Sequence, residues 1–179
     1  MQHNLGNELE RTPLISTCVQ VGSPGSYISD KAEKINADLI IMGTRDDHDG
    51  IDRIFGSVTT TTIEKSKITV LVVSEDSDIR SISNAAFASE ISDSNPFHIW
   101  ETIRLLSVFK PSIKIINVKE DTTEGGHTLA DFEGFYKENV VHPTISFHEL
   151  VKDDSIADVI EDFVSNTRID LLVMYKSHR

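Results

Sequence analysis

The sequence predicts an α/β fold, built on a mainly parallel sheet with flanking helices. Short apolar runs of strand length alternate with segments whose apolar residues recur at helical spacing. The run Leu39–Met42 is apolar at every position, which is typical of a strand buried on both faces of a sheet. A segment near the start of the chain also recurs near its end. This alternation favours helices layered on a parallel sheet.

The first part of the chain carries a clear helix start. Ser23 is a favourable N-cap residue, and Pro24 follows at the first helical position, where its missing N–H costs nothing. The other elements expected here are strands at Leu14–Val21, Leu39–Met42 and Ile68–Val73, and a helix at about Ser57–Lys65.

The mostly polar stretch Glu75–Ser83 is predicted to be a linker, after which the pattern restarts. Asn95 and Pro96 open a helix with Trp100 on its apolar face, so we expect Trp100 in the core. Ser155 is expected to cap a further helix. The elements expected here are strands at Asn84–Ser89, Ile113–Val118, Ile145–Leu150 and Leu171–Tyr175, and helices from Asn95, at Thr128–Asn139 and at Ser155–Asn166.

The chain contains an internal repeat. The stretch SYISDKAEKINADLIIMG resembles DVIEDFVSNTRIDLLVMY, so that Asp38 matches Asp170 and Met42 matches Met174, 132 residues further on. A shared helix, Asp turn, buried strand and terminal Met argue against coincidence.

Composition and charge exclude several classes of protein. The 179 residues include 17 Lys plus Arg against 29 Asp plus Glu, a net charge of −12, which disfavours binding to nucleic acid or to anionic lipid. No apolar run approaches the roughly 20 residues of a membrane span, and the N-terminus lacks a signal-peptide core. Cys18 is the only cysteine, so a cytoplasmic location is expected.

The segment IMGTRDDHDGIDRIFGSVTTTTIEKSKITVLVV resembles the C-terminal half of universal stress protein domains. Members of that family that bind ATP carry the pattern G-x2-G-x9-G-[ST]. Gly43 matches the first position and Gly56 and Ser57 match the last two at the correct spacing, but Asp46 replaces the second glycine. The segment from Asn84 to Asp121 is similar to the N-terminal half of the same domain.

The resemblance implies an adenine-nucleotide α-hydrolase-like topology, a five-stranded parallel sheet with helices on both faces, present here as two partial repeats. Residues 1–74 would be the C-terminal half of a first repeat, 75–83 a linker, and 84–179 the N-terminal part of a second. With the 132-residue offset, the equivalent of Phe87 falls before Met1 and that of Gly56 falls beyond Arg179. Both repeats are therefore expected to be incomplete.

By this resemblance, the candidate ATP site is the loop that joins a strand to the following helix. Unpaired backbone N–H groups at the positive end of the helix dipole would hold phosphates, and glycine would let the backbone approach them. The cofactor implied is ATP with Mg²⁺. The residues that would border it are Met42, Gly43, Asp46, Gly56, Ser57, Val58 and Thr59.

The same residues also permit a simpler interpretation, in which Gly43 and Gly56 serve turns and Ser57 is only a helix cap. The loop between them is acidic, and carboxylates near a phosphate cost energy unless Mg²⁺ or a displaced side chain relieves the repulsion. Its charged residues are Asp46, Asp47, Asp49 and Asp52 against Arg45 and Arg53. We therefore expect nucleotide binding to be weak or absent.

The second half is expected to lack the site altogether. Tyr175 stands where the first half has Gly43, and its side chain blocks close backbone approach. The positions that correspond to the adenine side of the family site lie near Ala88, Ser89, Glu90 and Val118.

Other candidate sites are weaker, and we expect neither a metal site nor a catalytic residue. His142, His148 and Glu149 could share a metal ion only if the fold brought them together, and solvated strand residues are the simpler interpretation. Thr59–Thr62 is either a phosphorylation site or simply a helix face.

The expected function is that of a non-enzymatic stress-response protein that acts by self-association or through a protein partner. The family resemblance implies pairing of copies through the strand Ile68–Val73. One alternative is an ATP-binding member of the family with weak or no hydrolysis. Another is an acidic scaffold that only self-assembles.

We expect each half to form its own small sheet, with the two lying side by side. In the alternative arrangement, Leu171–Tyr175 or Leu39–Met42 pairs with Asn84–Ser89 in one composite sheet. The linker contains no helix to bring the chain back across a shared sheet, which favours separate sheets.

Overall fold

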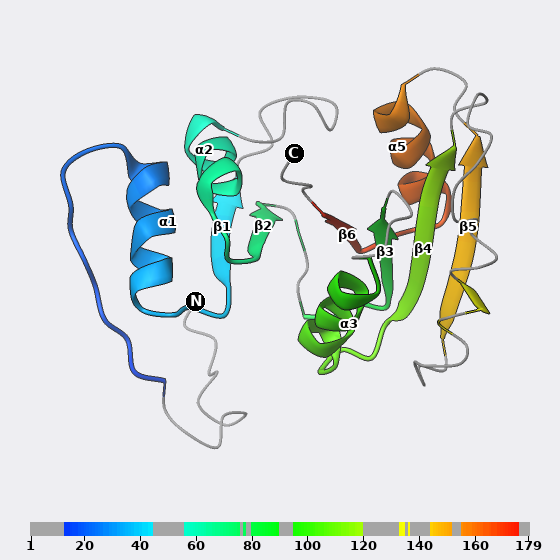
Figure 1. Ribbon diagram of the computed structural model, residues 1–179, viewed down its shortest axis with the longest axis horizontal. Coiled ribbons are helices and arrows are strands. Elements are labelled where there is room, and N and C mark those ends of the chain that lie inside the picture. The colour runs from blue at the N-terminus through cyan, green and yellow to red at the C-terminus, as the bar shows by residue number, and fades with distance from the viewer. Residues whose placement is uncertain are drawn as a thin grey trace. The chain divides into compact units, whose positions relative to one another are not determined.

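The computed structural model describes residues 13–44, 56–75, 77, 80–89, 95–119, 133–134, 136, 144–151 and 155–175. The chain divides into two compact units: unit 1 comprises Met1–Asp47 and Ile54–Glu75, and unit 2 comprises His48–Arg53 and Asp76–Arg179. The predicted α/β class is confirmed, because the paired strands are parallel and helices flank the sheets (Figure 1).

Unit 1 has the order helix, strand, helix, strand. Its elements are α1 (Pro24–Lys34), β1 (Ile40–Thr44), α2 (Ser57–Lys65) and β2 (Val70–Ser74). Strands β1 and β2 form a two-stranded parallel sheet, and α1 packs against α2 (Figure 1).

One face of the β1–β2 sheet is covered and the other is open. Ile40 is buried, whereas its neighbour Ile41 has 66% of its surface exposed. Successive residues of a strand point to opposite faces, so the open face is the one that carries Ile41.

Helices α1 and α2 approach closely because small residues line their contact. Gly25 lies against Thr61, and the buried hydroxyl of Ser29 donates to the backbone oxygens of Gly25 (3.1 Å) and of Thr62 in α2 (3.3 Å). The buried hydroxyl of Thr62 in turn donates to the oxygen of Val58 at 2.8 Å. Only the bond from Ser29 to Thr62 joins the two helices; the other two satisfy each buried hydroxyl within its own helix.

Unit 2 contains a four-stranded parallel sheet in the order β5-β4-β3-β6. Its elements are β3 (Asn84–Ala88), α3 (Asn95–Leu106), β4 (Ser112–Lys119), β5 (Ile145–Val151), α5 (Ile156–Asn166) and β6 (Leu171–Met174). The chain moves from β3 outward to β5 and then returns to the other side of β3. This reversal of direction creates a switch point between β3 and β6, where open α/β sheets typically bind ligands.

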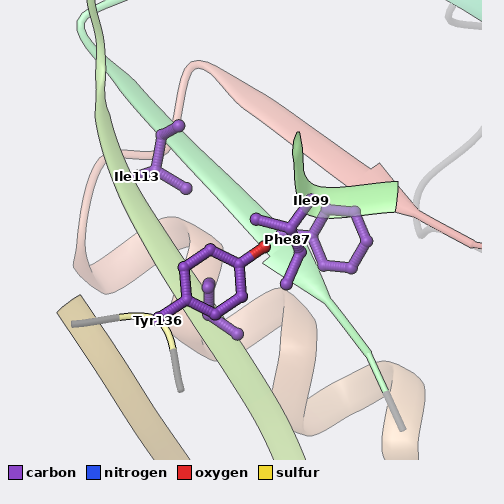
Figure 2. Packing of buried hydrophobic residues seen from close by; sticks show 5 residues of the cluster. Phe87, Ile99, Ile113 and Tyr136 are labelled. Carbon is purple, nitrogen blue, oxygen red and sulfur yellow. The ribbon is translucent and has the colours of Figure 1, made fainter. Parts of the chain in front are cut away.

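The core of unit 2 has a layer on each face of the sheet. On one face Phe87 and Ile113 pack with Ile99 of α3 and with Tyr136, as Figure 2 shows. On the other face Ala86 and Ile116 pack against Ile160 of α5. The adjacent residues Ala86 and Phe87 thus serve opposite layers, as the alternation of a strand requires.

The helix starts agree in part with their predicted caps. The hydroxyl of Ser155 accepts a hydrogen bond from the backbone N–H of Asp158 at 3.0 Å, as predicted for α5. Ser23 occupies the N-cap position of α1 with Pro24 following it, but its side chain makes no capping bond.

Two sequence predictions were wrong. Leu14–Val21 forms no strand, and Leu14 is 99% exposed, because no described strand lies beside it to accept its hydrogen bonds. Trp100 is 51% exposed rather than in the core, because the apolar face of α3 is wider than the part that the sheet covers. Of the helix predicted at Thr128–Asn139, only residues 133, 134 and 136 are described, and these are helical.

The described strands form two separate sheets, one in each unit, as the preferred arrangement predicted; the side-by-side placement stays a prediction. Strand β6 pairs with β3, a contact that the sequence analysis assigned to the composite alternative, but both strands belong to unit 2. Across the described ranges, β3 has β4 and β6 as its neighbours rather than β1. Among these residues, no helix is long and apolar enough to cross a membrane.

Candidate functional site

The candidate phosphate loop lies between the end of β1 and the start of α2. Met42 and Gly43 belong to β1, and Gly56 is the N-cap residue of α2. Ser57 is the first residue of the helix, followed by the predicted site residues Val58 and Thr59. The fold thus brings strand end and helix start into one unit. Asp46 and the other charged residues of the loop lie outside the described residues.

The two glycines of the motif are not required by packing within the described chain. A Cβ atom added to Gly43 or to Gly56 would meet nothing within 4 Å. Gly56 has φ −61°, which any residue can adopt, so the interpretation of this glycine as a turn residue is not supported. With respect to the described residues, both positions leave the open space that a phosphate cradle needs.

The N-terminus of α2 carries no side-chain cap from the residues that the structure describes. Gly56 holds the N-cap position, and its oxygen accepts from the N–H of Thr60 at 3.0 Å. The alternative role of Ser57 as the N-cap residue is therefore wrong. The first N–H groups of a helix have no partner within it, so this end can receive an anion.

The side chains of the first turn are not equally available. Ser57 is exposed, but Thr59 is only 5% exposed and faces the interior. Thr59 could therefore offer its backbone N–H to a ligand rather than its hydroxyl. Burial of Thr59 and Thr62 also disfavours phosphorylation at these two positions of the Thr59–Thr62 run.

The equivalent position in unit 2 is occupied by an aromatic stack. The ring of Tyr175, immediately after β6, stacks on His98 of α3 with ring centroids 3.7 Å apart and an interplanar angle of 22°. His98 also lies 3.5 Å from the carboxylate of Glu101. The stack joins the carboxyl end of β6 to α3, the helix that follows β3, and these two strands flank the switch point.

Sequence reasoning identified Tyr175 but missed His98. The spacing between them gives no signal, because the two residues are 77 positions apart and lie on unrelated local patterns. Their contact follows from the pairing of β6 with β3. Of the adenine-side positions, Ala88 and Val118 pack together against the core cluster around Ile116, so their side chains are committed to the fold. Ser89 follows β3 directly, and Glu90 lies outside the described residues.

The histidine and acidic residues considered for a metal are engaged separately. His148 lies 2.9 Å from the hydroxyl of Ser146, whereas Glu149 pairs with Lys119 at 3.7 Å. As neighbours on β5 they point to opposite faces of the sheet. His142 lies outside the described residues. In the part of the chain that the structure describes, no cluster of three metal-ligating side chains occurs.

A shallow hollow lies away from all of these positions. Cys18 lies 2.8 Å from the hydroxyl of Tyr27 at one side of it. The residues that line it are Cys18, Gln20, Gly22, Ser23, Pro24, Tyr27 and Ile28, and none belongs to the predicted loop.

Comparisons with known proteins agree with this fold. The universal stress protein family matches residues 7–74. A universal stress protein from Archaeoglobus fulgidus DSM 4304 is similar in structure, with a TM-score of 0.62 and 20% sequence identity. The match covers 84% of this chain and 53% of that one, so the chain spans about half the length of its structural neighbour. No curated protein matches. The family resemblance seen in the sequence is thus supported: residues 7–74 match the universal stress protein family, and the chain has a universal stress protein fold.

Proposed function

We propose that this universal stress protein-like chain is a non-catalytic protein of the stress response that acts by associating with itself or with a protein partner. The observation that supports this role is the set of open strand edges. Within the described residues, β5 and β6 each have one strand neighbour, and so do β1 and β2. Unpaired edges are templates for pairing with another chain.

The proposal includes the division of the chain into two partial repeats, 1–74 and 84–179, joined by a linker at 75–83. The matching order of helix and strand before Met42 and before Met174 supports it. The open face that carries Ile41 adds apolar surface to the open edges of unit 1.

Light scattering over a concentration series tests the association. We expect a mass above that of one 20.0 kDa chain, increasing with concentration until one oligomer dominates. A monodisperse monomer at every concentration would contradict self-association. Partner binding would then have to be shown with an identified protein.

A second candidate function is ATP binding at the start of α2. Among the described residues, no side chain caps this helix end and nothing fills the space at Gly43 and Gly56, which favours ATP binding. The four aspartates of the intervening loop oppose it, because they repel phosphate. On balance we propose binding too weak to define the function, and no hydrolysis.

Titration calorimetry with Mg-ATP separates the two candidates. We expect no binding tighter than a Kd of about 10 μM, which corresponds to about 7 kcal/mol. If weaker binding is seen, Asp46→Gly should strengthen it, and Gly56→Val should abolish it, because the added side chain fills space that the fold itself leaves empty. Tight binding by the unmodified chain would make ATP binding the better function.

The third candidate, an acidic scaffold that only self-assembles, predicts association without ligand or partner. Its assembly should strengthen with added salt, because screening reduces repulsion between chains of net charge −12. The leading proposal also includes self-association of the same acidic chain, so it predicts the same salt response. Specific binding of an identified protein partner separates the two, because the scaffold binds none.

A further inference from the structure

The outer edge of β6 is an open edge of the four-stranded sheet. Strand β6 pairs with β3 on one side, and none of the described strands pairs with the other. The edge is accessible at its carboxyl end, where Met174 is 54% exposed and Tyr175 is also exposed.

The backbone groups that face this edge follow from the register. The N–H of Ser112 in β4 donates to Ser83, and the N–H of Ser89 donates to Ile116 in β4. The backbone N–H and C=O groups of odd-numbered residues of β3 therefore face β4. Those of even-numbered residues, such as Ala86, face β6. Ala86 lies opposite Leu172. In a parallel pair, when the backbone groups of one residue face the partner strand, the residue opposite it directs its own N–H and C=O away from that pairing.

Leu172 and Met174 consequently present their backbone groups to the open edge. Strand β1 provides a template for what could bind there. The N–H of Ile40 donates to the backbone oxygen of Thr69 at 2.9 Å. The backbone N–H and C=O groups of Ile40 and Met42 therefore face β2. In the repeat with its 132-residue offset, Leu172 is equivalent to Ile40 and Met174 is equivalent to Met42. The open edge of β6 is therefore equivalent to the edge of β1 that β2 occupies.

We propose that the outer edge of β6 binds residues 70–74 of a second copy of this chain as a parallel strand. The strand Val-Leu-Val-Val-Ser already pairs in this way with the equivalent strand β1, where Met42 lies opposite Val72. By equivalence, Met174 lies opposite the Val72 of the second copy. The inference rests on the proposed self-association and names the surface that carries it.

The second copy supplies this strand by exchange. Among the described strands its β2 has one neighbour, β1, so release of β2 breaks a single strand pairing. The family resemblance implied that copies pair through the strand Ile68–Val73; here that strand of one copy instead pairs with β6 of the other. Exchange of β2 between copies would extend the four-stranded sheet of unit 2 by a fifth strand.

Cysteine cross-linking between two full-length variants tests the register. Both carry Cys18→Ser; one adds Met174→Cys and the other Val72→Cys. Mixed and mildly oxidised, they should form a disulfide-linked heterodimer, because residues opposite one another on adjacent strands lie within disulfide reach. The matched control replaces Val72→Cys with Val70→Cys, which lies two residues out of register. We expect at least a tenfold lower cross-linking rate in the control.

Equal rates for the two mixtures, or no cross-link in either, would overturn the proposed register. If the chain still oligomerises in light scattering, self-association stands and only this surface is wrong; a monomer overturns both. A third variant carries Met174→Cys and Val72→Cys in one chain. A disulfide within single monomeric chains of this variant would overturn the second copy as the source of the strand. Thermal unfolding of each variant confirms that the fold is retained.

Discussion

The Cβ atom of Thr61 in α2 lies 2.7 Å from the position that a Cβ atom on Gly25 of α1 would occupy. The backbone oxygen of Val58 is nearly as close, at 2.9 Å. Real Cβ atoms do not approach other atoms so closely, and backbone atoms cannot simply turn aside. Gly25 is therefore required by the contact between the two helices of unit 1.

Gly25→Ala should destabilise unit 1 by about 1–3 kcal/mol, the usual cost of overpacking. Gly43→Ala is the matched control, because Gly43 lies in β1 rather than at a helix end and a Cβ there meets no described atom within 4 Å. Chemical denaturation followed by far-UV circular dichroism measures both. Equal midpoints for the two variants would show that α1 and α2 do not pack as described.

Ile99→Ala should cost about 2–5 kcal/mol, because Ile99 is fully buried in the cluster around Phe87 (Figure 2) and its truncation leaves a cavity. Leu105→Ala, on the exposed side of the same helix, should cost much less. Denaturant unfolding of the two variants compares them directly. A larger loss for Leu105→Ala would mean that α3 faces the sheet with its other side.

Ser155→Ala should cost about 0.5–2 kcal/mol, because it removes the side chain that accepts from the N–H of Asp158. Ser23→Ala is the comparison at another N-cap position, where no side-chain capping bond exists. We expect a measurable fall in unfolding free energy for the first variant and little change for the second.

Asp170→Ala should be costly, by about 1–3 kcal/mol, because its carboxylate accepts from the backbone N–H groups of Ser83 (2.9 Å) and Asn84 (2.8 Å) at the start of β3. Asp38, the equivalent residue of unit 1, is exposed and accepts no such bond from the described residues, so Asp38→Ala should change little. Hydrogen exchange at Ser83 and Asn84 reports the loss directly. Unchanged protection there would contradict the role of Asp170.

His148 should make stability fall with acidification. Burial lowers the pKa of His148 from its ordinary value of 6.5, and the positive charge of Lys114 lowers it further. The unfolded chain then binds a proton more readily than the folded one, so stability is fully present above pH 6.5 and is lost as pH falls through the lowered pKa. His148→Gln should reduce the fall in melting temperature between about pH 7.5 and pH 5.5. Identical pH profiles would exclude this contribution.

The sequence predicted those features that depend on local signals. Helix α2 begins and ends at the predicted residues, because Gly56 and Ser57 mark its start and a short apolar strand follows its end. Leu14–Val21 has a strand composition, but a strand needs a neighbour, and composition does not supply one. The helical periodicity placed Trp100 on the apolar face of α3. How much of that face is buried depends on the area that the sheet covers, which the helix sequence does not determine. The ring contact of Tyr175 with His98 depends on strand order and could not be read from either segment alone.

The half-exposed position of Trp100 makes it an optical reporter of one unit. It is the only tryptophan of the chain, it lies in unit 2, and the guanidinium of Arg104 sits 5.8 Å from the centre of its ring. Its fluorescence will therefore report the melting of α3 in unit 2. Far-UV circular dichroism, in contrast, reports the helix content of both units together. A temperature at which the two signals diverge would reveal that one half of the molecule loses its structure before the other.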